Sequence, residues 1–397
     1  MSSRFLLPTA LLLLVAGCAS APRNPGSSQP FAFRALDLRQ QDPAGRPAWA
    51  LQSPEARYDI SRKFAQALRP RGTVFRDGKA SIEISAQRGT VIGDGQAIQL
   101  EGDVRIRLLG KDPVEISGDA ARWLPREDLM VIDQRPVATD RRSRITAQTA
   151  RYLINKDLVE LRGAPVLEHW QEGRSTDPKK ASFPLKVKTR WVDWKPDQGD
   201  LTAPALVRGE RFDPAVKPKA GVKPKPAMVL TAQGLKGNLR AGYVDLLAPV
   251  QVRSADRKGW LNAQQTRWAI NEQRLSSALP FSGELNALKA KGQAYQIDLK
   301  ASDVLIPAGC VIEQPGEQLS ARACLWNWPS GRFEAREQVV LRRQTYKQIT
   351  RADRLDGRIG NDGIAVFRSP GARVNSRFTL PKSQQGGKTR PATPIAF

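Results

Sequence analysis

The 397-residue chain is poor in the side chains that most enzymes use for catalysis, with one histidine, three cysteines and three methionines. No conventional Ser-His-Asp or Cys-His arrangement exists without His169, which we place in a loop as an incidental surface residue. One histidine and no Cys-x-x-Cys pair argue against a metal site. A Gly-x-x-x-x-Gly-Lys-Ser/Thr loop is also lacking, so the chain does not hydrolyse nucleotides itself. The sequence therefore predicts neither an enzyme nor a cofactor.

Near the amino terminus, the apolar stretch from Phe5 to Val15 is too short to span a bilayer, which needs roughly 20 residues. Its length suits the hydrophobic region of a secretory signal. The sequence Val-Ala-Gly-Cys that ends at Cys18 resembles a bacterial lipobox, in which the cysteine becomes the first mature residue and carries the lipid. We therefore predict a signal peptide over residues 1–17, lipidation at Cys18, and a periplasmic protein anchored to a membrane. The alternative is an ordinary signal peptide cut after Ala19 or Ala21.

Acidic residues are outnumbered, with 39 Asp and Glu against 63 Lys and Arg, which gives a net charge of +24. Such a field favours acidic partners. Nucleic acid is a poor candidate outside the cytoplasm, and no nucleic-acid recognition motif is visible. Because the basic residues alternate with apolar ones, two interpretations remain: a solvated outer face that prevents edge-to-edge aggregation, or binding of anionic lipid head groups.

A two-strand unit recurs along almost the whole chain. Its clearest copies begin with ISAQRG at Ile84, ITAQTARY at Ile145 and LTAQGLKG at Leu230. Looser copies start at Ile116, Leu185, Leu261, Leu288, Leu319 and Ile349. Most steps between starts are close to 30 residues. A repeat of this period indicates a stacked architecture in which each unit buries its apolar side against its neighbours.

The strand character of the units rests on alternation with a period of two. From Ile98 to Leu108 the even-numbered positions are apolar or glycine, whereas the odd-numbered ones, such as Gln99 and Arg105, are polar. This pattern is typical of a half-buried strand. The turn signal Gly93-Asp94-Gly95 lies between two such runs. The sequence therefore predicts an all-β fold of stacked antiparallel hairpin units, and a sandwich with coincidental strand spacing is the alternative.

The same signals define the organisation of the chain. Residues 18–48 are rich in Pro, Gly, Ser and Gln and read as a lipid-anchored tether. Residues 49–381 form the repeated β body, and the polar residues 382–397 a disordered tail. Cys310 and Cys324 lie on the closing strand of one unit and the opening strand of the next, which we expect side by side. In an exported chain they form either a disulfide or a pair of buried free thiols.

Taken together, the units resemble those of LptC and its OstA-like relatives, the periplasmic bridge components of lipopolysaccharide transport. The matching stretches are ISAQRG at 84–89 with LEGDV at 100–104, ISGDAARW at 116–123, and ITAQTARY at 145–152 with LRGAPV at 161–166. The segment WALQSPEARYD at 49–59 is most similar to the start of a long, cyanobacterial-type LptC. Unlike the usual member, this chain has a predicted lipid anchor and about twice the common length.

The resemblance implies an elongated β-jellyroll open along one side, a trough that shelters acyl chains and passes lipopolysaccharide from an inner-membrane ABC transporter toward the outer membrane. It also implies edge-strand pairing with other OstA-like bridge proteins. The residues expected to line the lipid-binding trough are Ile84, Ile98, Leu100, Val104, Ile106, Ile116, Ile145, Leu161 and Leu230. The alternative function is that of a carbohydrate-binding or structural envelope β-solenoid lipoprotein.

Overall fold

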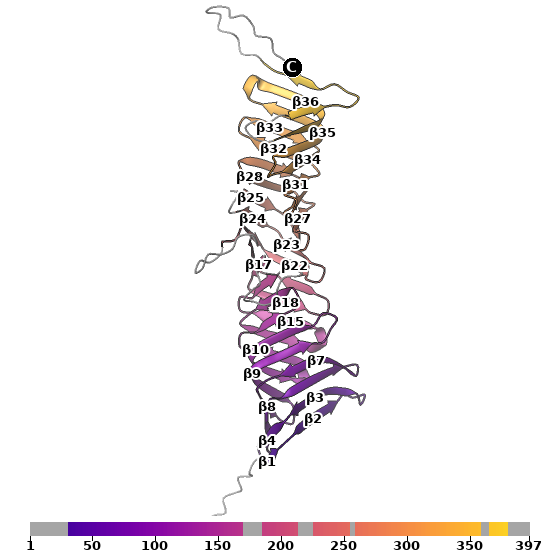
Figure 1. The fold of residues 1–397 in the computed structure, drawn as a ribbon, viewed down its shortest axis with the longest axis vertical. Helices are drawn as coiled ribbons and strands as arrows, with labels where there is room; N and C mark the ends of the chain where they lie inside the picture. The colour runs from indigo at the N-terminus through magenta and orange to yellow at the C-terminus, as the bar shows by residue number, and fades with distance from the viewer. Residues whose placement is uncertain (1–30, 170–184, 213–224, 255–258, 359–364, 380–397) are drawn as a thin grey trace, which may run out of the picture.

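The computed structural model describes residues 31–169, 185–212, 225–254, 259–358 and 365–379. They form one continuous antiparallel sheet of 38 strands, stacked from the N-terminal to the C-terminal end of an elongated body (Figure 1). The predicted all-β fold is thereby confirmed. None of the described residues forms a helix that is long and apolar enough to cross a membrane. The predicted signal peptide, Cys18 and the tail at 382–397 lie outside the described residues.

The strands pair in two ladders, and four long strands belong to both. Ladder A consists of β2 (Leu36–Gln41), β3 (Pro47–Ser53), β6 (Arg71–Arg76), β7 (Lys79–Ser85), β9 (Ala97–Leu108), β10 (Val114–Leu124), β12 (Val137–Thr139), β13 (Ser143–Thr146), β16 (Val166–His169), β17 (Leu185–Lys188), β20 (Val207–Arg211), β21 (Met228–Ala232), β24 (Val250–Ser254), β25 (Gly259–Ala263), β28 (Phe281–Leu285), β29 (Leu288–Gly292), β32 (Cys310–Gln314), β33 (Glu317–Ala321), β35 (Arg332–Arg343), β36 (Gln348–Arg358) and β38 (Asn375–Arg377).

Ladder B shares β9, β10, β35 and β36 with ladder A. Its other strands are β1 (Phe31–Phe33), β4 (Glu55–Asp59), β5 (Phe64–Leu68), β8 (Arg88–Ile92), β11 (Leu129–Ile132), β14 (Thr149–Leu153), β15 (Leu158–Arg162), β18 (Trp191–Lys195), β19 (Asp200–Ala203), β22 (Gly234–Asn238), β23 (Tyr243–Leu247), β26 (Thr266–Ala269), β27 (Arg274–Ser277), β30 (Tyr295–Asp298), β31 (Asp303–Ile306), β34 (Ala323–Asn327) and β37 (Ala365–Arg368). Short 3-10 turns, η1 (Pro125–Glu127), η2 (Ile154–Lys156) and η3 (Thr345–Lys347), lie at hairpin tips.

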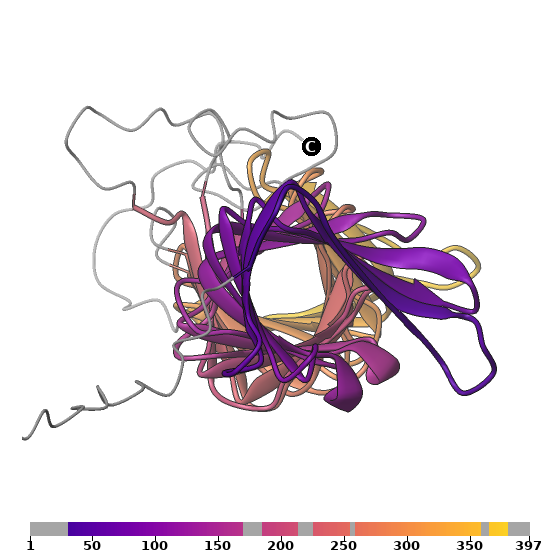
Figure 2. The same ribbon diagram turned by 90° about the horizontal axis from the view of Figure 1, so that it is seen from below.

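Each repeat of about 30 residues makes one circuit of this structure. The chain runs through a hairpin in one ladder, crosses to the other ladder, forms a hairpin there and crosses back, as in β12 to β16. All crossings lie along one long side, which we call the seam, and all hairpin tips lie along the opposite long side, which we call the open side. The cross-section is therefore a folded trough, and the end-on view shows the strands arranged around a central axis (Figure 2).

The recurring apolar-x-Ala motif marks one place in this circuit. Its copies fall on the ladder A strands that run toward the seam, such as β13 with Ile145 and β21 with Leu230. The long strand β9 passes the seam without interruption, because Gly102 (φ 74°) and Asp103 (φ 47°) bend its backbone there. This left-handed conformation favours glycine, whose lack of a Cβ removes the steric cost.

The polar outer face of ladder A carries opposite charges on neighbouring strands. Glu168 on β16 lies between Arg144 on β13, at 3.7 Å, and Lys186 on β17, at 3.1 Å. Lys186 is in turn directly opposite Glu210 of β20. Each exposed pair stabilises the fold by only about 0–1 kcal/mol. Many of the basic residues are thus solvated partners of carboxylates on the outer surface.

Two segments differ from the sequence-based expectation. Residues 31–48, predicted to be tether, form β1, β2 and the first residues of β3. The alternation of apolar and polar residues in these strands is short. The many polar residues around it make the segment resemble a linker. His169, expected in a surface loop, ends β16 and is only 1% exposed. The sequence does not indicate that His169 belongs to a strand, because the segment that follows it is polar.

Candidate ligand-binding interior

The structure places all nine predicted trough residues between the two ladders. Their exposed fractions are 3% for Ile84, 0% for Ile98, 2% for Leu100, 0% for Val104, 1% for Ile106, 0% for Ile116, 1% for Ile145, 0% for Leu161 and 2% for Leu230. They belong to one continuous apolar cluster that runs from Trp49 to Leu355. Gln99 and Arg105, at the intervening positions, face solvent. In this part of the molecule the side chains fill the interior against one another.

Toward the C-terminal end the interior contains an apolar cavity. The cavity has a volume of about 200 Å³, which is smaller than the roughly 300–1,000 Å³ of pockets that enclose a whole small organic ligand. Both ladders line it, with Phe281, Leu288 and Ile312 from ladder A and Ile297, Val304 and Phe333 from ladder B. None of the nine predicted residues lines this cavity. The alternation of apolar residues thus predicts the inner face of the strands, but not the part of that face that lines a cavity.

Small residues at inward positions explain the hollow. Gly259 and Gly283 lie at inner positions of β25 and β28, and Ala290 follows on β29. Both glycines line the cavity with their backbone, since they have no side chain to extend across it. Ala290, Ile297 and Val304 are accordingly only partly buried. The signal in the sequence is the replacement of Ile and Leu by Gly and Ala at inward positions after Gly259.

The tips of ladder B form a stacked column along the open side. The first residue of one tip donates its backbone N–H to the last residue of the preceding tip, as from Leu239 to Gly199 (2.9 Å) and from Ile270 to Gly242 (2.8 Å). The side chains of Leu239 and Ile270 are buried. Their counterparts Leu299 and Trp328 line the cavity instead. The hollow part of the interior therefore reaches the open side at these two tips.

One cationic side chain lies at the border of the cavity. Arg211, at the end of β20, lines the cavity and donates from Nη2 to Oε1 of Gln273 at 3.1 Å. The carboxylate of Glu284 lines the cavity as well, so the apolar hollow has one charged group of each sign at its border.

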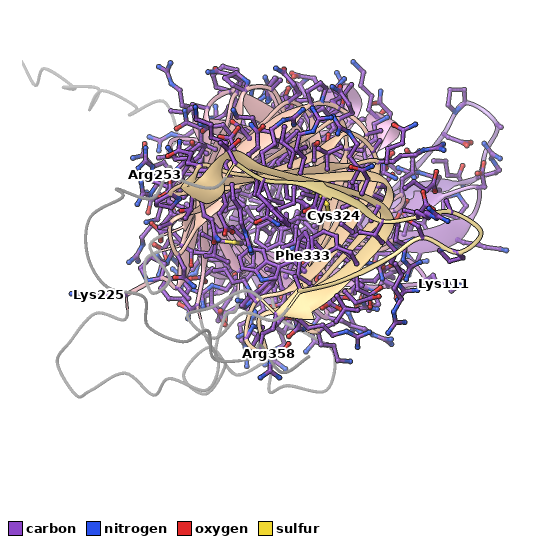
Figure 3. The ribbon with its side chains drawn as sticks, turned by 90° about the horizontal axis from the view of Figure 1, so that it is seen from above. Lys111, Lys225, Arg253, Cys324, Phe333 and Arg358 are labelled. Carbon is purple, nitrogen blue, oxygen red and sulfur yellow. A yellow bond between two sulfur atoms is a disulfide. The ribbon has the colours of Figure 1, made fainter. Side chains whose placement is uncertain are left out.

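A disulfide joins the two ladders beside the cavity. Cys310 on β32 of ladder A is bonded to Cys324 on β34 of ladder B, with a Cα–Cα distance of 6.0 Å. The sequence predicts that these two strands are neighbours in one ladder. In the structure they instead face each other across the interior. Cys324 and Phe333 lie toward the axis in the end-on view, whereas Lys111, Lys225, Arg253 and Arg358 lie at the rim (Figure 3). The bond therefore restrains the spacing of the ladders at the cavity.

The single histidine is a buried polar group of the interior. Its Nδ1 lies 3.0 Å from Oγ of Ser143, which is directly opposite it on β13. Burial lowers the pKa of His169 to about 4, and the nearby Arg142 guanidinium acts in the same direction. The imidazole is therefore neutral at physiological pH. Ser143 is in turn held by Asp140, whose Oδ1 accepts the backbone N–H of Ser143 at 2.5 Å, so His169 belongs to a buried polar cluster at this tip of ladder A.

This pKa makes the fold sensitive to acid. The folded-state pKa lies below the ordinary value of 6.5, so the unfolded chain binds the proton first. Above pH 6.5 the neutral imidazole makes its full contribution to the free energy of unfolding. About 3 kcal/mol of that free energy is lost as the pH falls toward 4. We expect a His169→Gln variant to lose less stability than the parent between pH 7.5 and 4.5 in urea unfolding followed by circular dichroism. Parallel losses in both proteins would refute the burial argument.

The fold and its interior define a class of protein: an extended, open β-jellyroll with an apolar interior and a charged exterior. Consistent with that class, residues 16–164 match the family model described as lipopolysaccharide-assembly, LptC-related. The resemblance to LptC is thereby confirmed over that part of the chain. The matched part ends at β15, before the cavity begins.

Among solved structures, the chain is similar to LptH of Pseudomonas aeruginosa, described as the LptA-homologous periplasmic component of the conserved lipopolysaccharide transport device. The two share 12% sequence identity with a TM-score of 0.26, over 34% of this chain and 87% of LptH. No curated protein matches the chain.

Proposed function

We propose that this protein is a periplasmic bridge component of lipopolysaccharide transport, which shelters acyl chains in its interior and passes lipid from an inner-membrane ABC transporter toward the outer membrane. The observation that carries the proposal is the continuous apolar interior, which opens into the C-terminal cavity. Every 100 Å² of acyl surface covered there is worth about 2.5 kcal/mol. The match to the LptC-related family over residues 16–164 supports the same function.

The two ends of the body support docking to further bridge proteins. At the N-terminal end β1 and β2 each pair on one side only, and at the C-terminal end β37 and β38 do so. Phe31 (54%) and Phe33 (43%) on β1 are exposed, as is Val366 (44%) on β37. Exposed edges with apolar side chains are suited to pairing with a strand of another protein. The lipid anchor at Cys18 would hold the N-terminal end near the membrane, and the inner membrane is the one we favour.

The proposal can be tested by filling the cavity with a larger side chain. Ala290 faces inward on β29 and is partly buried, so Ala290→Phe places a ring in the hollow. We expect this variant to bind lipopolysaccharide and a fluorescent C12 fatty acid at least tenfold more weakly than the parent protein. Ala323→Phe is the matched control, because Ala323 faces outward beside Cys324 on β34. Equal binding by all three proteins in native mass spectrometry and fluorescence titration would contradict the cavity as the acyl site.

A structural envelope role is the second candidate. It is favoured by the filled interior of the N-terminal part, where Ile98, Val104 and Ile116 have no exposed surface. A purely structural protein would bind neither the fatty acid nor lipopolysaccharide, before or after Ala290→Phe. Binding of delipidated saccharide alone would instead favour a carbohydrate-binding function.

A further inference from the structure

Hairpin tips of ladder A contact tips of ladder B across the open side at three levels. At the first level Arg76 of β6 contacts the tips that follow β14 and β18. At the second level Asp112 contacts Arg240. At the third level Arg211 contacts Gln273. The partners are far apart in the chain, with separations of 78 residues at the first level and 62 at the third. Each contact therefore links different repeats as well as different ladders.

The first level is built around a buried carboxylate. The guanidinium of Arg76 donates to the carbonyl oxygen of Ile154 and lies 3.9 Å from Oδ2 of Asp197. Asp157 holds these two tips of ladder B together, since its Oδ2 accepts the backbone N–H of Asp197 at 2.8 Å. Its other oxygen accepts the hydroxyl of Tyr152 at 3.4 Å. The ladder B side of this level is thus fixed, and Arg76 reaches it from ladder A.

At the second level a polar contact covers an apolar residue. Nε of Arg240 lies 3.4 Å from Oδ2 of Asp112, which belongs to the tip between β9 and β10. The neighbouring Leu239 is 4% exposed and points into the interior beneath this ion pair. Trp194 and Asp140 complete a small hollow at the same place. The contact therefore closes the open side above the packed interior.

The third contact stands at the border of the cavity, and most of the cavity lies beyond it. Past Gln273, every ion pair among the described residues lies within one ladder or at the seam. Leu299 and Trp328 line the cavity there, at the tip positions that Leu239 and Ile270 occupy in the closed part. The closed part of the open side thus coincides with the filled interior, and the unclosed part with the hollow.

We propose that the three contacts form a clasp that closes the open side over the filled half of the interior and has to part for an acyl-chain ligand to occupy that half. The inference rests on the proposed function. The filled half has no room for an acyl chain at the present spacing of the ladders, because side chains such as Ile98 and Ile116 already occupy it. The ladders are joined covalently at the seam, so they can separate only at the open side. Exposed ion pairs contribute little each, so contacts of this kind can open and close again.

The proposal can be tested by cross-linking the two sides of the clasp in the folded protein. In the full-length chain with Cys18→Ser, Asp112→Cys and Arg240→Cys are joined by a short bis-maleimide, which does not react with the intact Cys310–Cys324 disulfide. The matched control joins Arg88→Cys to Glu101→Cys, an ion pair of 3.2 Å on the outer face of ladder B. Benzoylphenylalanine replaces Trp123 in the filled half or Phe333 at the cavity, so that an aromatic ring replaces an aromatic ring. Each protein is irradiated with purified lipopolysaccharide.

We expect locking to reduce lipid capture at position 123 at least tenfold, while capture at position 333 changes less than twofold. The same cysteine pair without the linker, and the locked control pair, should capture lipid at both positions. Undiminished capture at position 123 in the locked protein would overturn the clasp and leave the proposed function standing. A lack of capture at both positions in every protein would overturn the proposed function and the clasp with it.

Discussion

Replacing Trp123 with alanine should lower the local free energy of unfolding by about 3–5 kcal/mol, the range for truncating a buried tryptophan. The ring is 1% exposed and meets the ring of Trp49 edge to face, with centroids 5.5 Å apart. It also lies against Gly72 of β6, where a Cβ would be 3.3 Å from Cζ3 of the ring. Trp123 thus bridges ladder B and ladder A, and its removal leaves a hole in the filled half.

Because repeats contact only their neighbours, the loss should be local rather than spread over the whole body. Amide hydrogen exchange, read by mass spectrometry, is therefore the suitable measurement, and we expect faster exchange in β3, β6 and β8 to β11. Trp191→Ala is the control, since Trp191 faces outward on β18 and its loss should cost about 1 kcal/mol. Equal effects of the two substitutions would contradict the assignment of inner and outer faces.

Removing the disulfide should cost about 3 kcal/mol, the chain-entropy value for a closed loop of about 15 residues. The double variant Cys310→Ala and Cys324→Ala removes the covalent link between β32 and β34 without leaving a free thiol. Cys310 is fully buried and Cys324 is 3% exposed, so the methyl groups of alanine stay in an apolar site. We expect the midpoint of thermal unfolding of the C-terminal repeats to fall.

The disulfide prediction also has a functional side. Since the bond restrains the ladders beside the cavity, its loss should weaken binding of the fluorescent fatty acid, while exchange in β3 to β11 stays unchanged. The oxidised parent protein, before and after mild reduction, provides the control with no substitution at all. Unchanged stability and binding in both comparisons would show that the ladders keep their spacing without the bond.

Some of these residues could be placed from the sequence and others could not. The alternation from Ile98 to Leu108 correctly gave the inner face, because strand side chains alternate whatever the strand pairs with. Cys310 and Cys324 were expected on neighbouring strands but lie on opposite ladders, since linear spacing does not tell which ladder a strand joins. His169 was placed on the surface, although Ser143 on the opposed strand gives it a buried partner.

The sequence by itself determined that this protein is a stack of antiparallel hairpins with an apolar inner face, because alternation and the repeat of about 30 residues are local properties of the chain. Only the tertiary structure decided where the interior is filled and where it is hollow. That depends on which side chains meet across roughly 10 Å between the ladders, as Trp123 meets Trp49, whereas the backbone of Gly283 lines the cavity. The clasp is likewise tertiary, since Arg76 and Ile154 are brought together only by stacking.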